Sequence, residues 1–339
     1  MQPKNRFTMC TFSMTIKTLL LGLCLTACHE NEEAYAATPS EQETEAEISS
    51  GYTTLLNKTS SVPAEYLEES DFQGSVVQID YDTRNYVDGN GEMRSNTAYV
   101  YLPYEYEESS DECYDVFYFV HGHGETAASF FQNENGMMRN LLDHLIAKGD
   151  MSPVIVVSTS YVYGTPVDYY PEALPQELVN DLIPLVESRY RTYAQQTDFK
   201  GLQASRNHRA IGGFSMGAVT TWYALECTLD CFKYFMPISS DGWSLGRFAG
   251  MDYPDETAAH LADIIRSSSP SGNDFYIWAC SGTDDVAYDR IWTQVQAMAQ
   301  ITDVFDVNHL TFHEQEGARH VFGSLTEYFY NALPYLFPN

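Results

Sequence analysis

The chain has 339 residues, of which 44% are hydrophobic and 14% aromatic, so it can bury one sizeable core and is near the upper size of a single domain. Its 18 basic and 47 acidic residues give a formal net charge of -29 at pH 7. This charge argues against nucleic acid as a partner, because phosphate binding needs clustered Lys and Arg. Such acidity fits an extracellular protein that self-repulsion keeps dispersed.

The N-terminus has the anatomy of an export signal. A basic start precedes the apolar run 18–27, TLLLGLCLTA, which is too short to span a membrane as a stable helix. The run leads into LTAC, which ends at Cys28 and resembles the lipobox of bacterial lipoproteins. We therefore predict a signal peptide over 1–27 and a lipid on Cys28, with the protein on the bacterial cell surface or a periplasm-facing membrane. The alternative is ordinary secretion after cleavage behind Ala36.

The segment after the signal is acidic and poor in residues to bury. Positions 29–50 hold seven glutamates and no Lys or Arg. We predict a disordered linker over 28–60 and a folded domain over 61–339.

The folded domain contains four cysteines, and two of them are close in sequence. Cys227 and Cys231 are four residues apart, so they form either a disulfide, which an exported protein permits, or two thiols on one helix. Their spacing lacks the partner ligands that a zinc site would need.

From residue 61 onward, apolar runs typical of buried strands alternate with helical patterns. The expected strands are 74–82, 96–104, 114–120, 152–160, 208–214, 233–239, 274–282 and 309–315, and the expected helices are 137–149, 175–192 and 216–225. A turn-rich stretch joins the first two strands, so we expect them to be antiparallel. The alternation predicts an α/β domain with a mostly parallel central sheet and helices on both faces.

The stretch GGFSMGAVTTWY, residues 212–223, places Ser215 between Gly213 and Gly217. Glycine and serine are common, so a GxSxG pattern alone is weak. Here it falls between a buried strand and a helix, at the carboxyl end of a strand, where doubly wound sheets bind ligands. Small neighbours suit a serine at a tight corner, and the helix start favours developing negative charge. We predict that Ser215 is a nucleophile.

A nucleophilic serine needs a histidine base and an acid that orients it, and in this architecture the chain order is serine, acid, histidine. His320, in the glycine-containing loop EQEGARHVF after the last strand, is the predicted base. The acid is expected after strand 274–282, where Asp284 and Asp285 are adjacent. Adjacent side chains diverge, so we expect one of the two to reach His320. Asp241, after MPISS, is the alternative acid.

An oxyanion hole needs two backbone N–H donors. We predict that Met216, directly after the serine, supplies one. His123, in the loop HGHGE at 121–125, supplies the other, because the glycines let this backbone approach a substrate. A rival interpretation takes HGHGE as the start of a metal site. That site would need further His or Asp ligands close by, which TAASFFQNENG after the loop does not offer, so we expect no metal.

Seven motifs, in order from about residue 70 to the C-terminus, resemble carbohydrate esterase family 1 and, within it, the feruloyl esterase domains of bacterial xylanases. They are YVYLPYEY, FVHGHGE, PQELVNDLIPLVESRYRTYA, SRNHRAIGGFSMGAVTTWY, YFMPISSDGW, SGTDDVAY and EGARHVF. The resemblance implies an α/β-hydrolase fold and a serine esterase that needs no cofactor.

The resemblance also implies the roles of single residues. The implied site consists of the nucleophile Ser215, the base His320, the acid Asp285 rather than Asp284, and the oxyanion amides of Met216 and His123. The chain departs from the family at His123, where many relatives have a glycine or an apolar residue, and at Ala218, where a glycine is frequent. These departures remove no catalytic group and bear on the shape of the acyl pocket.

The family also includes acetyl-xylan esterases, thioester hydrolases and acyltransferases. The resemblance therefore defines the substrate less closely than the type of reaction. Trp243, Tyr161 and Tyr163 lie in predicted strand-end loops, where they either stack on a feruloyl ring or a sugar or pack under the loops. We expect release of ferulate from arabinoxylan or xylo-oligosaccharides by an enzyme held at the membrane through Cys28. The alternatives are an acetyl-xylan esterase of the same fold and an inactive surface protein that binds glycans.

Overall fold

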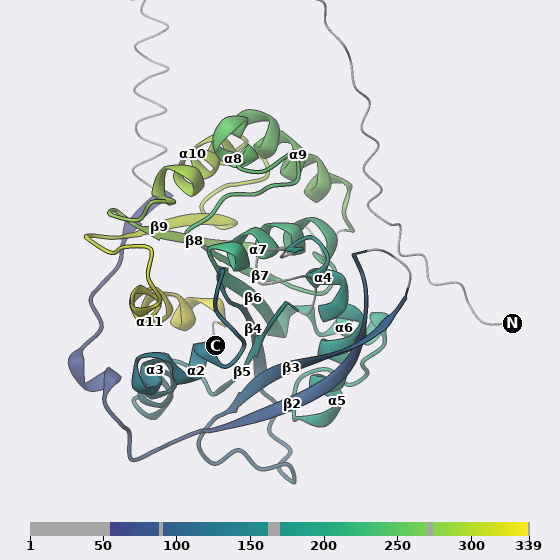
Figure 1. Cartoon of the computed structure of the whole chain (residues 1–339), viewed down its shortest axis with the longest axis vertical. Coiled ribbons are helices and arrows are strands. Elements are labelled where there is room, and N and C mark those ends of the chain that lie inside the picture. Colours follow the sequence, from purple (N-terminus) through teal and green to yellow (C-terminus); the bar gives the residue numbers. More distant parts are fainter. Residues whose placement is uncertain (1–54, 88–90, 162–169, 270–273, 338–339) are drawn as a thin grey trace, which may run out of the picture. The chain divides into compact units, whose positions relative to one another are not determined.

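Figure 1 shows the computed structural model of the chain, which describes residues 55–87, 91–161, 170–269 and 274–337. These residues belong to one unit that runs from Ser50 to Asn339. The predicted signal peptide, the predicted lipidation site Cys28, most of the predicted linker and Tyr163 lie outside the described residues.

A nine-stranded sheet forms the centre of this unit, in the order β1-β9-β8-β7-β6-β4-β5-β3-β2. Each neighbouring pair from β1 to β5 in this order is parallel, whereas β3 pairs antiparallel with both β5 and β2. The prediction of a mostly parallel sheet with an antiparallel opening pair is confirmed. The strands are β1 (Leu56–Lys58), β2 (Ser75–Arg84), β3 (Met93–Leu102), β4 (Asp115–Val120), β5 (Val154–Thr159), β6 (Arg209–Phe214), β7 (Tyr234–Ile238), β8 (Tyr276–Gly282) and β9 (Leu310–Gln315).

Strand β4 shows why the central strands appear in the sequence as continuous apolar runs. Val116, Tyr118 and Val120 belong to one buried cluster, and the alternating Phe117 and Phe119 belong to the other. Successive side chains point to opposite faces of a strand. A strand that is covered on both faces therefore needs apolar residues at every position.

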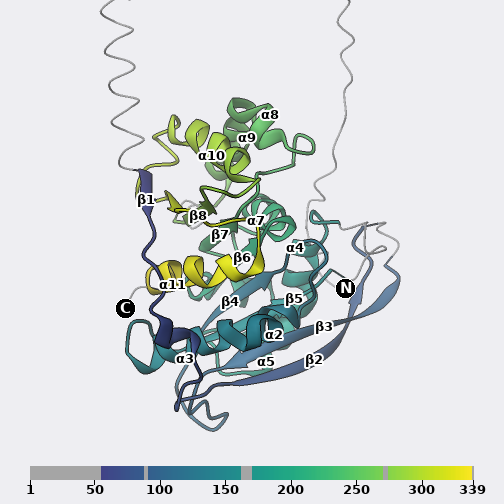
Figure 2. The same cartoon turned by 60° about the vertical axis from the view of Figure 1, so that its left-hand side comes forward.

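Helices cover both faces of the sheet (Figures 1 and 2). One layer shares a buried cluster with Phe117 and Phe119 and contains α2 (Ser129–Gln132), α3 (Met137–Ala147) and α11 (Leu325–Leu336). The other layer contains α4 (Leu174–Glu177), α5 (Ile183–Arg189), α7 (Met216–Cys227), α9 (Pro254–Ser267) and α10 (Tyr288–Ala299). The remaining α-helices of the described residues are α6 (Phe199–Ala204) and α8 (Ala249–Asp252).

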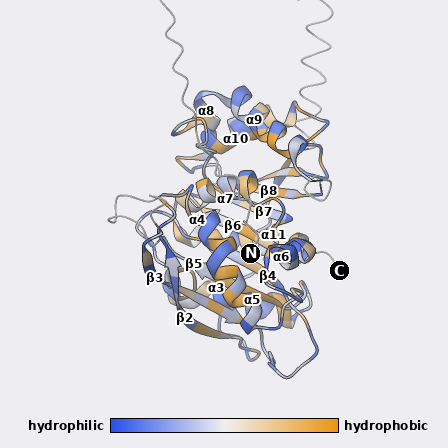
Figure 3. Cartoon of the chain, turned by 90° about the vertical axis from the view of Figure 1, so that its right-hand side faces the viewer, coloured by the Kyte–Doolittle hydropathy of each residue, from blue (hydrophilic) through white to orange (hydrophobic). Residues whose placement is uncertain are grey.

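The hydropathy of the chain follows this layered arrangement. Figure 3 shows hydrophobic residues in the central strands, whereas the covering helices carry both hydrophilic and hydrophobic stretches. Such amphipathic helices bury one side against the sheet and leave the other in water. Within the part of the chain that the structure describes, no helix has the length and apolar character needed to cross a bilayer.

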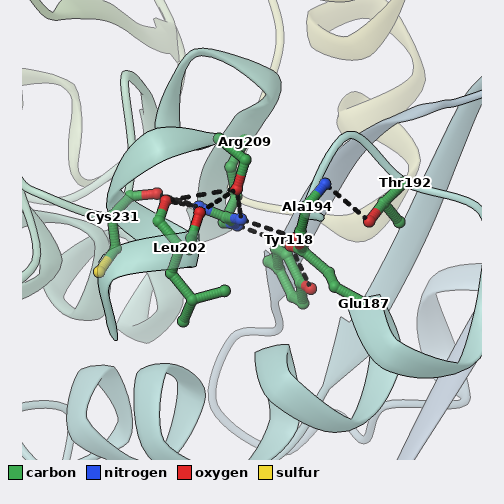
Figure 4. A network of polar contacts seen from close by, with 9 residues as sticks. Tyr118, Glu187, Thr192, Ala194, Leu202, Arg209 and Cys231 are labelled. Atoms are coloured by element: carbon green, nitrogen blue, oxygen red, sulfur yellow. Dashed lines mark hydrogen bonds and ion pairs between the residues drawn. The ribbon is translucent and has the colours of Figure 1, made fainter. Parts of the chain in front are cut away.

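A buried ion pair fixes the amino end of β6. Arg209, the first residue of β6, donates to both carboxylate oxygens of Glu187 on α5 at 2.6 Å, and both side chains are fully buried (Figure 4). The guanidinium also donates to the carbonyl oxygens of Leu202 and Cys231, and the hydroxyl of Tyr118 donates to Glu187. A buried charge pair is tolerated when its remaining hydrogen-bonding groups are satisfied, so this network holds the segments around β6 in one arrangement.

The predicted linker ends too late. Leu56–Lys58 form β1, which pairs in parallel with β9, and the preceding Leu55 is buried. The amide of Thr59 continues the pairing by donating to the carbonyl oxygen of Glu314 at 3.1 Å. A strand of three residues has no visible periodicity and owes its existence to the partner strand, which explains why the sequence pattern did not reveal it.

The predicted helix 175–192 is interrupted. Its first part is α4, followed by a π-helical turn at Leu178–Leu182 and then α5. Pro184 follows this turn. Because proline has no N–H to donate, it disrupts regular α-helical bonding, which is consistent with the change of pitch at this point.

Cys227 and Cys231 are both thiols, with no disulfide between them in the described chain. Cys231 is buried, and burial raises the pKa of its thiol to about 12. Of the two readings that their spacing allowed, the structure has the pair of thiols.

His313 on β9 is a mostly buried histidine. Its ring stacks on the indole of Trp278, with centroids 4.1 Å apart, and its Nε2 lies 3.0 Å from Thr311 Oγ1. Burial lowers the pKa of His313 to about 3. The imidazole is therefore neutral in the folded protein at ordinary pH.

Candidate active site

Ser215 occupies a strained corner between β6 and α7. Its φ is 56° and its ψ is -110°, a conformation that L-residues rarely adopt. The corner is possible because of its two glycines: a Cβ on Gly217 would overlap the carbonyl oxygen of Val120, and a Cβ on Gly213 would overlap the backbone of Gly217. The amide of Ser215 donates to the carbonyl oxygen of Ile238 on the adjacent β7 at 2.8 Å. The glycines of GxSxG are thus required by close backbone packing.

The structure brings Ser215, His320 and Asp285 together in one chain of hydrogen bonds. The imidazole Nε2 of His320 lies 2.9 Å from Ser215 Oγ, and its Nδ1 lies 2.8 Å from Asp285 Oδ1. An ionised carboxylate can only accept hydrogen bonds, so Nδ1–H donates to Asp285. Nε2 is then free to accept the hydroxyl proton of Ser215. This is the arrangement in which a serine hydroxyl can be activated as a nucleophile.

Two loops that are far apart in sequence hold the acid and the base in register. The amide of Asp284, after β8, donates to the carbonyl oxygen of Ala318, after β9, at 3.1 Å. In the other direction, the amide of Gly317 donates to Thr283 Oγ1 at 2.8 Å. A Cβ on Gly282 would overlap the backbone of Ala318. The close approach of these loops fixes Asp285 relative to His320.

The acid position distinguishes three aspartates. Asp285 is buried and also accepts a hydrogen bond from the amide of Ala287 at 2.7 Å. Its neighbour Asp284 is exposed. The alternative acid, Asp241, is buried elsewhere and accepts from Trp243 Nε1 at 3.2 Å and from the Met251 amide at 3.3 Å. Asp285 is the aspartate that the structure places on His320.

Cys280, on the strand that leads to Asp285, is a buried thiol. Burial, followed by the nearby Asp285 charge, raises its pKa well above the ordinary value. The thiolate is the reactive form of cysteine, so Cys280 is an inert neighbour of the site.

The loop after β4 approaches Ser215 from the other side. A Cβ on Gly122 would lie 3.4 Å from Ser215 Cβ and 3.2 Å from the ring of Phe214, so the backbone of this loop borders the serine. His123 follows with an exposed side chain, and Met216 begins α7. The backbone of both predicted oxyanion donors is therefore adjacent to residues that pack at the Ser215 corner.

His121 supports this loop, a role that the sequence did not reveal. Its Nδ1 lies 2.7 Å from the carbonyl oxygen of Gly122, and its Nε2 lies 2.7 Å from Ser160 Oγ. Burial lowers the pKa of His121, so the ring is neutral. Because a carbonyl can only accept, Nδ1 carries the proton and Ser160 donates to Nε2. His121 therefore connects the loop to the end of β5.

The HGHGE loop does not assemble a metal-ligand set. Its His121 is held as described, and Glu125 accepts a hydrogen bond from Asn133 Nδ2 at 2.9 Å. Among the residues that the structure describes, no three His, Cys, Asp or Glu side chains are grouped in a way that could hold a metal ion.

The predicted substrate-binding aromatics have partners within the protein. Trp243 packs edge-on against Phe248, with centroids 5.2 Å apart, in addition to its bond to Asp241. Tyr161 packs edge-on against His121 at 5.3 Å, and its hydroxyl lies 2.9 Å from Thr220 Oγ1 on α7. Both are half-buried. Tyr161 thus connects the loop at 121–125 to α7, and Tyr163 lies outside the described residues.

Sequence comparison identifies relatives along most of the chain. The family profile described as "Putative esterase" matches residues 91–335. A curated relative, the endo-1,4-beta-xylanase Y of Acetivibrio thermocellus, is 36% identical over 282 residues, which cover 81% of this chain and 24% of the xylanase. The chain therefore spans about a quarter of the length of this relative.

Solved structures give the same grouping. The feruloyl esterase module from Clostridium thermocellum, a serine-to-alanine mutant complexed with sinapinate, has a TM-score of 0.73 and 34% identity, and the match covers 83% of this chain and 94% of that chain. A ferulic acid esterase from the anaerobic fungus Anaeromyces mucronatus has a TM-score of 0.60 and 19% identity, with 83% and 98% covered. The second match bears on the fold alone. The predicted α/β-hydrolase fold and the predicted esterase relatives are confirmed.

Proposed function

We propose that the chain, which belongs to the esterase family and is a serine carboxylic-ester hydrolase, releases ferulate and related hydroxycinnamates from the arabinose side chains of xylan. The observation that carries the proposal is the hydrogen-bonded chain from Ser215 through His320 to Asp285 at the strained corner. Its chemistry is acyl transfer to a serine, followed by hydrolysis.

In the first half of the reaction, His320 Nε2 takes the proton from Ser215 Oγ as the oxygen attacks the ester carbonyl carbon. The Oγ–C bond forms and the carbonyl π electrons move onto its oxygen. The amides of Met216 and His123 donate to this oxyanion. His320 then gives its proton to the sugar oxygen as the bond between acyl carbon and sugar oxygen breaks. Asp285 stabilises the imidazolium between the two proton transfers.

In the second half, water replaces the sugar. His320 takes a proton from the water as its oxygen attacks the acyl carbon, and the same amides hold the oxyanion. The Oγ–C bond breaks, Ser215 regains its proton from His320, and the hydroxycinnamic acid leaves. These steps use water and the residues named above, and His320 ends in its starting protonation state.

The acyl group is the finer part of the proposal, and relatives support it. The Clostridium thermocellum relative is a feruloyl esterase module bound to sinapinate, a hydroxycinnamate. The curated relative is a xylanase, which is consistent with an ester on xylan as the substrate. An aromatic acyl group buries far more apolar surface than an acetyl group in a pocket that accepts it.

The test compares kcat/KM of the wild-type chain on methyl ferulate, an acetylated xylo-oligosaccharide and a short thioester. We expect methyl ferulate to be preferred roughly tenfold or more, the ratio that a few buried ring carbons would give. A clear preference for the acetylated sugar would make the protein an acetyl-xylan esterase. Preference for the thioester would overturn a cell-wall role, and arabinoxylan binding without turnover of any ester would indicate an inactive glycan-binding protein.

We also propose that lipid on Cys28 attaches the protein to a bacterial membrane. It is supported by the LTAC sequence at the end of the apolar run. Single-chain lipid anchoring is reversible, so several acyl chains on one cysteine are needed for stable attachment. Membrane and soluble fractions of cells that express the wild type or Cys28→Ser test this point. We expect the wild type in the membrane fraction and the variant outside it; equal partition would contradict anchoring.

A further inference from the structure

A cavity of about 750 Å³ lies at the opposite end of the sheet from Ser215. It is lined by the segments that enter the parallel strands: Asp115 begins β4, Pro153 precedes β5, His208 precedes β6 and Tyr234 begins β7. Ser215, in contrast, follows the carboxyl end of β6. A ligand in this cavity is therefore separated from the catalytic serine by the length of the strands, and the cavity has no part in the proposed ester hydrolysis.

The wall of this cavity carries an exposed aromatic platform. The ring of Tyr193 stacks on the imidazole of His208, with centroids 3.6 Å apart and an angle of 13° between the rings. Tyr193 is nevertheless 41% exposed, so the area left to solvent lies away from the face that His208 covers. At the edge of the same imidazole, His208 Nδ1 lies 2.7 Å from Asp115 Oδ1. The platform thus combines a flat apolar surface with a carboxylate at its base.

The platform is fixed by the fold. Thr192 forms a parallel β-bridge with Tyr114, and the amide of Tyr114 donates to the carbonyl oxygen of Arg191 at 3.1 Å. His208 precedes Arg209, whose guanidinium is locked in the buried network with Glu187 (Figure 4). A ligand that docks on Tyr193 would therefore order little of the protein, and the entropic cost of binding is reduced.

A second aromatic platform adjoins the first. A cavity of about 300 Å³ shares Pro153 as a wall and is lined by Phe72 and Tyr104, which are 52% and 43% exposed. These rings pack edge-on with centroids 5.4 Å apart. The segment that carries Phe72 is held by the amide of Gly74, which donates to the buried Asp143 at 2.8 Å. The two cavities, each lined by exposed aromatic rings, thus share Pro153 in their walls.

The charges around the two cavities limit the class of ligand. Four carboxylic residues line them, and among the described lining residues there is no Lys or Arg; the acidic members are Glu105, Glu112, Asp115 and Asp143. Anionic ligands, including free hydroxycinnamates and uronic acids, would be repelled. Aromatic rings offer a flat surface to the apolar face of a sugar ring, and carboxylates accept hydrogen bonds from sugar hydroxyls.

We infer that these two cavities form a non-catalytic binding site for a neutral oligosaccharide, which holds a xylan chain on the face opposite the esterase site. The choice of xylan rests on the proposed function, whereas the preference for a neutral sugar rests on the cavities alone. The second site would hold the enzyme on one xylan chain while Ser215 acts on an ester side chain of a neighbouring xylan chain. Pockets of this kind combine aromatic surface with a few polar groups that fix the ligand.

Isothermal titration of xylohexaose into the wild-type chain tests the site, with Tyr193→Ala, Phe72→Ala and Tyr253→Ala as variants. Tyr253 is an exposed tyrosine of the α8–α9 region outside both cavities and serves as the matched control. We expect Tyr193→Ala to raise the Kd about tenfold and Phe72→Ala several-fold. The Kd of Tyr253→Ala should stay within about twofold of wild type. Hydrogen exchange should slow at residues 112–115 on addition of xylohexaose.

The site is overturned if the wild type does not bind xylohexaose, or if Tyr193→Ala and Phe72→Ala bind it as the wild type does. Methyl ferulate hydrolysis is measured on the same wild-type sample to separate the two proposals. Hydrolysis without xylohexaose binding would overturn the second site alone. Binding that depends on Tyr193, without hydrolysis of any ester, would overturn the proposed function and leave the second site standing.

Discussion

Each end of the central sheet carries a histidine hydrogen-bonded to an aspartate, but the residue that contacts the rest of the imidazole differs between the two ends. At the carboxyl ends of the strands, His320 Nδ1 lies 2.8 Å from Asp285 Oδ1, and its Nε2 faces Ser215. At the amino ends, His208 Nδ1 lies 2.7 Å from Asp115 Oδ1, and an aromatic ring covers the imidazole face. Almost equal geometry thus occurs in two different settings.

The difference shows that a histidine–aspartate pair does not make a catalytic site by itself. What distinguishes the carboxyl end is a serine at a strained corner, aimed at the free imidazole nitrogen. The Asp285 side chain there is fully buried, whereas Asp115 keeps 17% of its side-chain surface in solvent. A buried, oriented carboxylate stabilises an imidazolium more strongly than a hydrated one.

Removal of Ser215 should have the largest effect, because it removes the feature that distinguishes the His320–Asp285 pair from the His208–Asp115 pair. Ser215→Ala is expected to lower kcat/KM on methyl ferulate by about five orders of magnitude or more, because no other group can form the acyl-enzyme. His320→Ala should be comparably damaging. The double variant should be little worse than either single one, since the residues act as a unit. Thermal unfolding of each variant serves as the control for folding, and near-normal turnover by Ser215→Ala would end the nucleophile assignment.

Substitution of Asp285 and of its neighbour Asp284 tests which carboxylate orients His320. Asp285→Asn should lower kcat about 10⁴-fold, because an amide can donate to Nδ1 and so place the imidazole proton on Nε2, where it faces Ser215. Asp284→Asn is the matched control. It changes the adjacent, exposed carboxylate and should leave kcat within about twofold of wild type. An inactive Asp284→Asn with an active Asp285→Asn would reverse the assignment of the acid.

His313 extends the comparison to a histidine whose pKa is lowered by burial alone, to about 3. Below about pH 6.5 the unfolded chain binds a proton at this residue and the folded protein does not. The free energy of unfolding should therefore fall as the pH drops towards 3, with a loss of about 1.4 kcal/mol from this group between pH 7.5 and 5.5.

Urea unfolding of the wild type and His313→Phe at both pH values measures this contribution. The phenylalanine keeps a ring against Trp278 and cannot titrate. The wild type should lose more stability than the variant on acidification, and the difference isolates this residue from the carboxylates. An identical pH dependence in both proteins would show that His313 is protonated in the folded state or accessible to water.

The sequence predicted the elements that repeat a pattern and missed those that depend on a partner. The buried strand at 114–120 was found because its positions 116–120 are all apolar or aromatic, and the Ser215 corner was found because glycine is required on both sides of it. Strand β1 was missed because its three residues gain order only by pairing with β9. The break at Leu178–Leu182 was missed because an amphipathic pattern does not report helical pitch.

The same division applies to the site. Chain order and loop position pointed to His320, and the family resemblance pointed to Asp285 over Asp284; the structure then placed Asp285 on the imidazole. The role of His121 was invisible because it depends on Ser160, which is distant in sequence. The platform of Tyr193 on His208 likewise joins residues that no short motif connects.

Strand β1 also bears on how the protein avoids self-association. A strand at the edge of a sheet exposes unpaired N–H and C=O groups that can template pairing with another molecule. β1 occupies the outer side of β9, and it ends at the exposed Lys58, whose ammonium lies 4.0 Å from Glu314. A charged, three-residue edge is a poor template. A chain trimmed to begin at residue 61 would leave the edge of β9 unpaired and should form higher-order aggregates detectable by light scattering. We therefore expect β1 to limit association between molecules through the edge of the sheet.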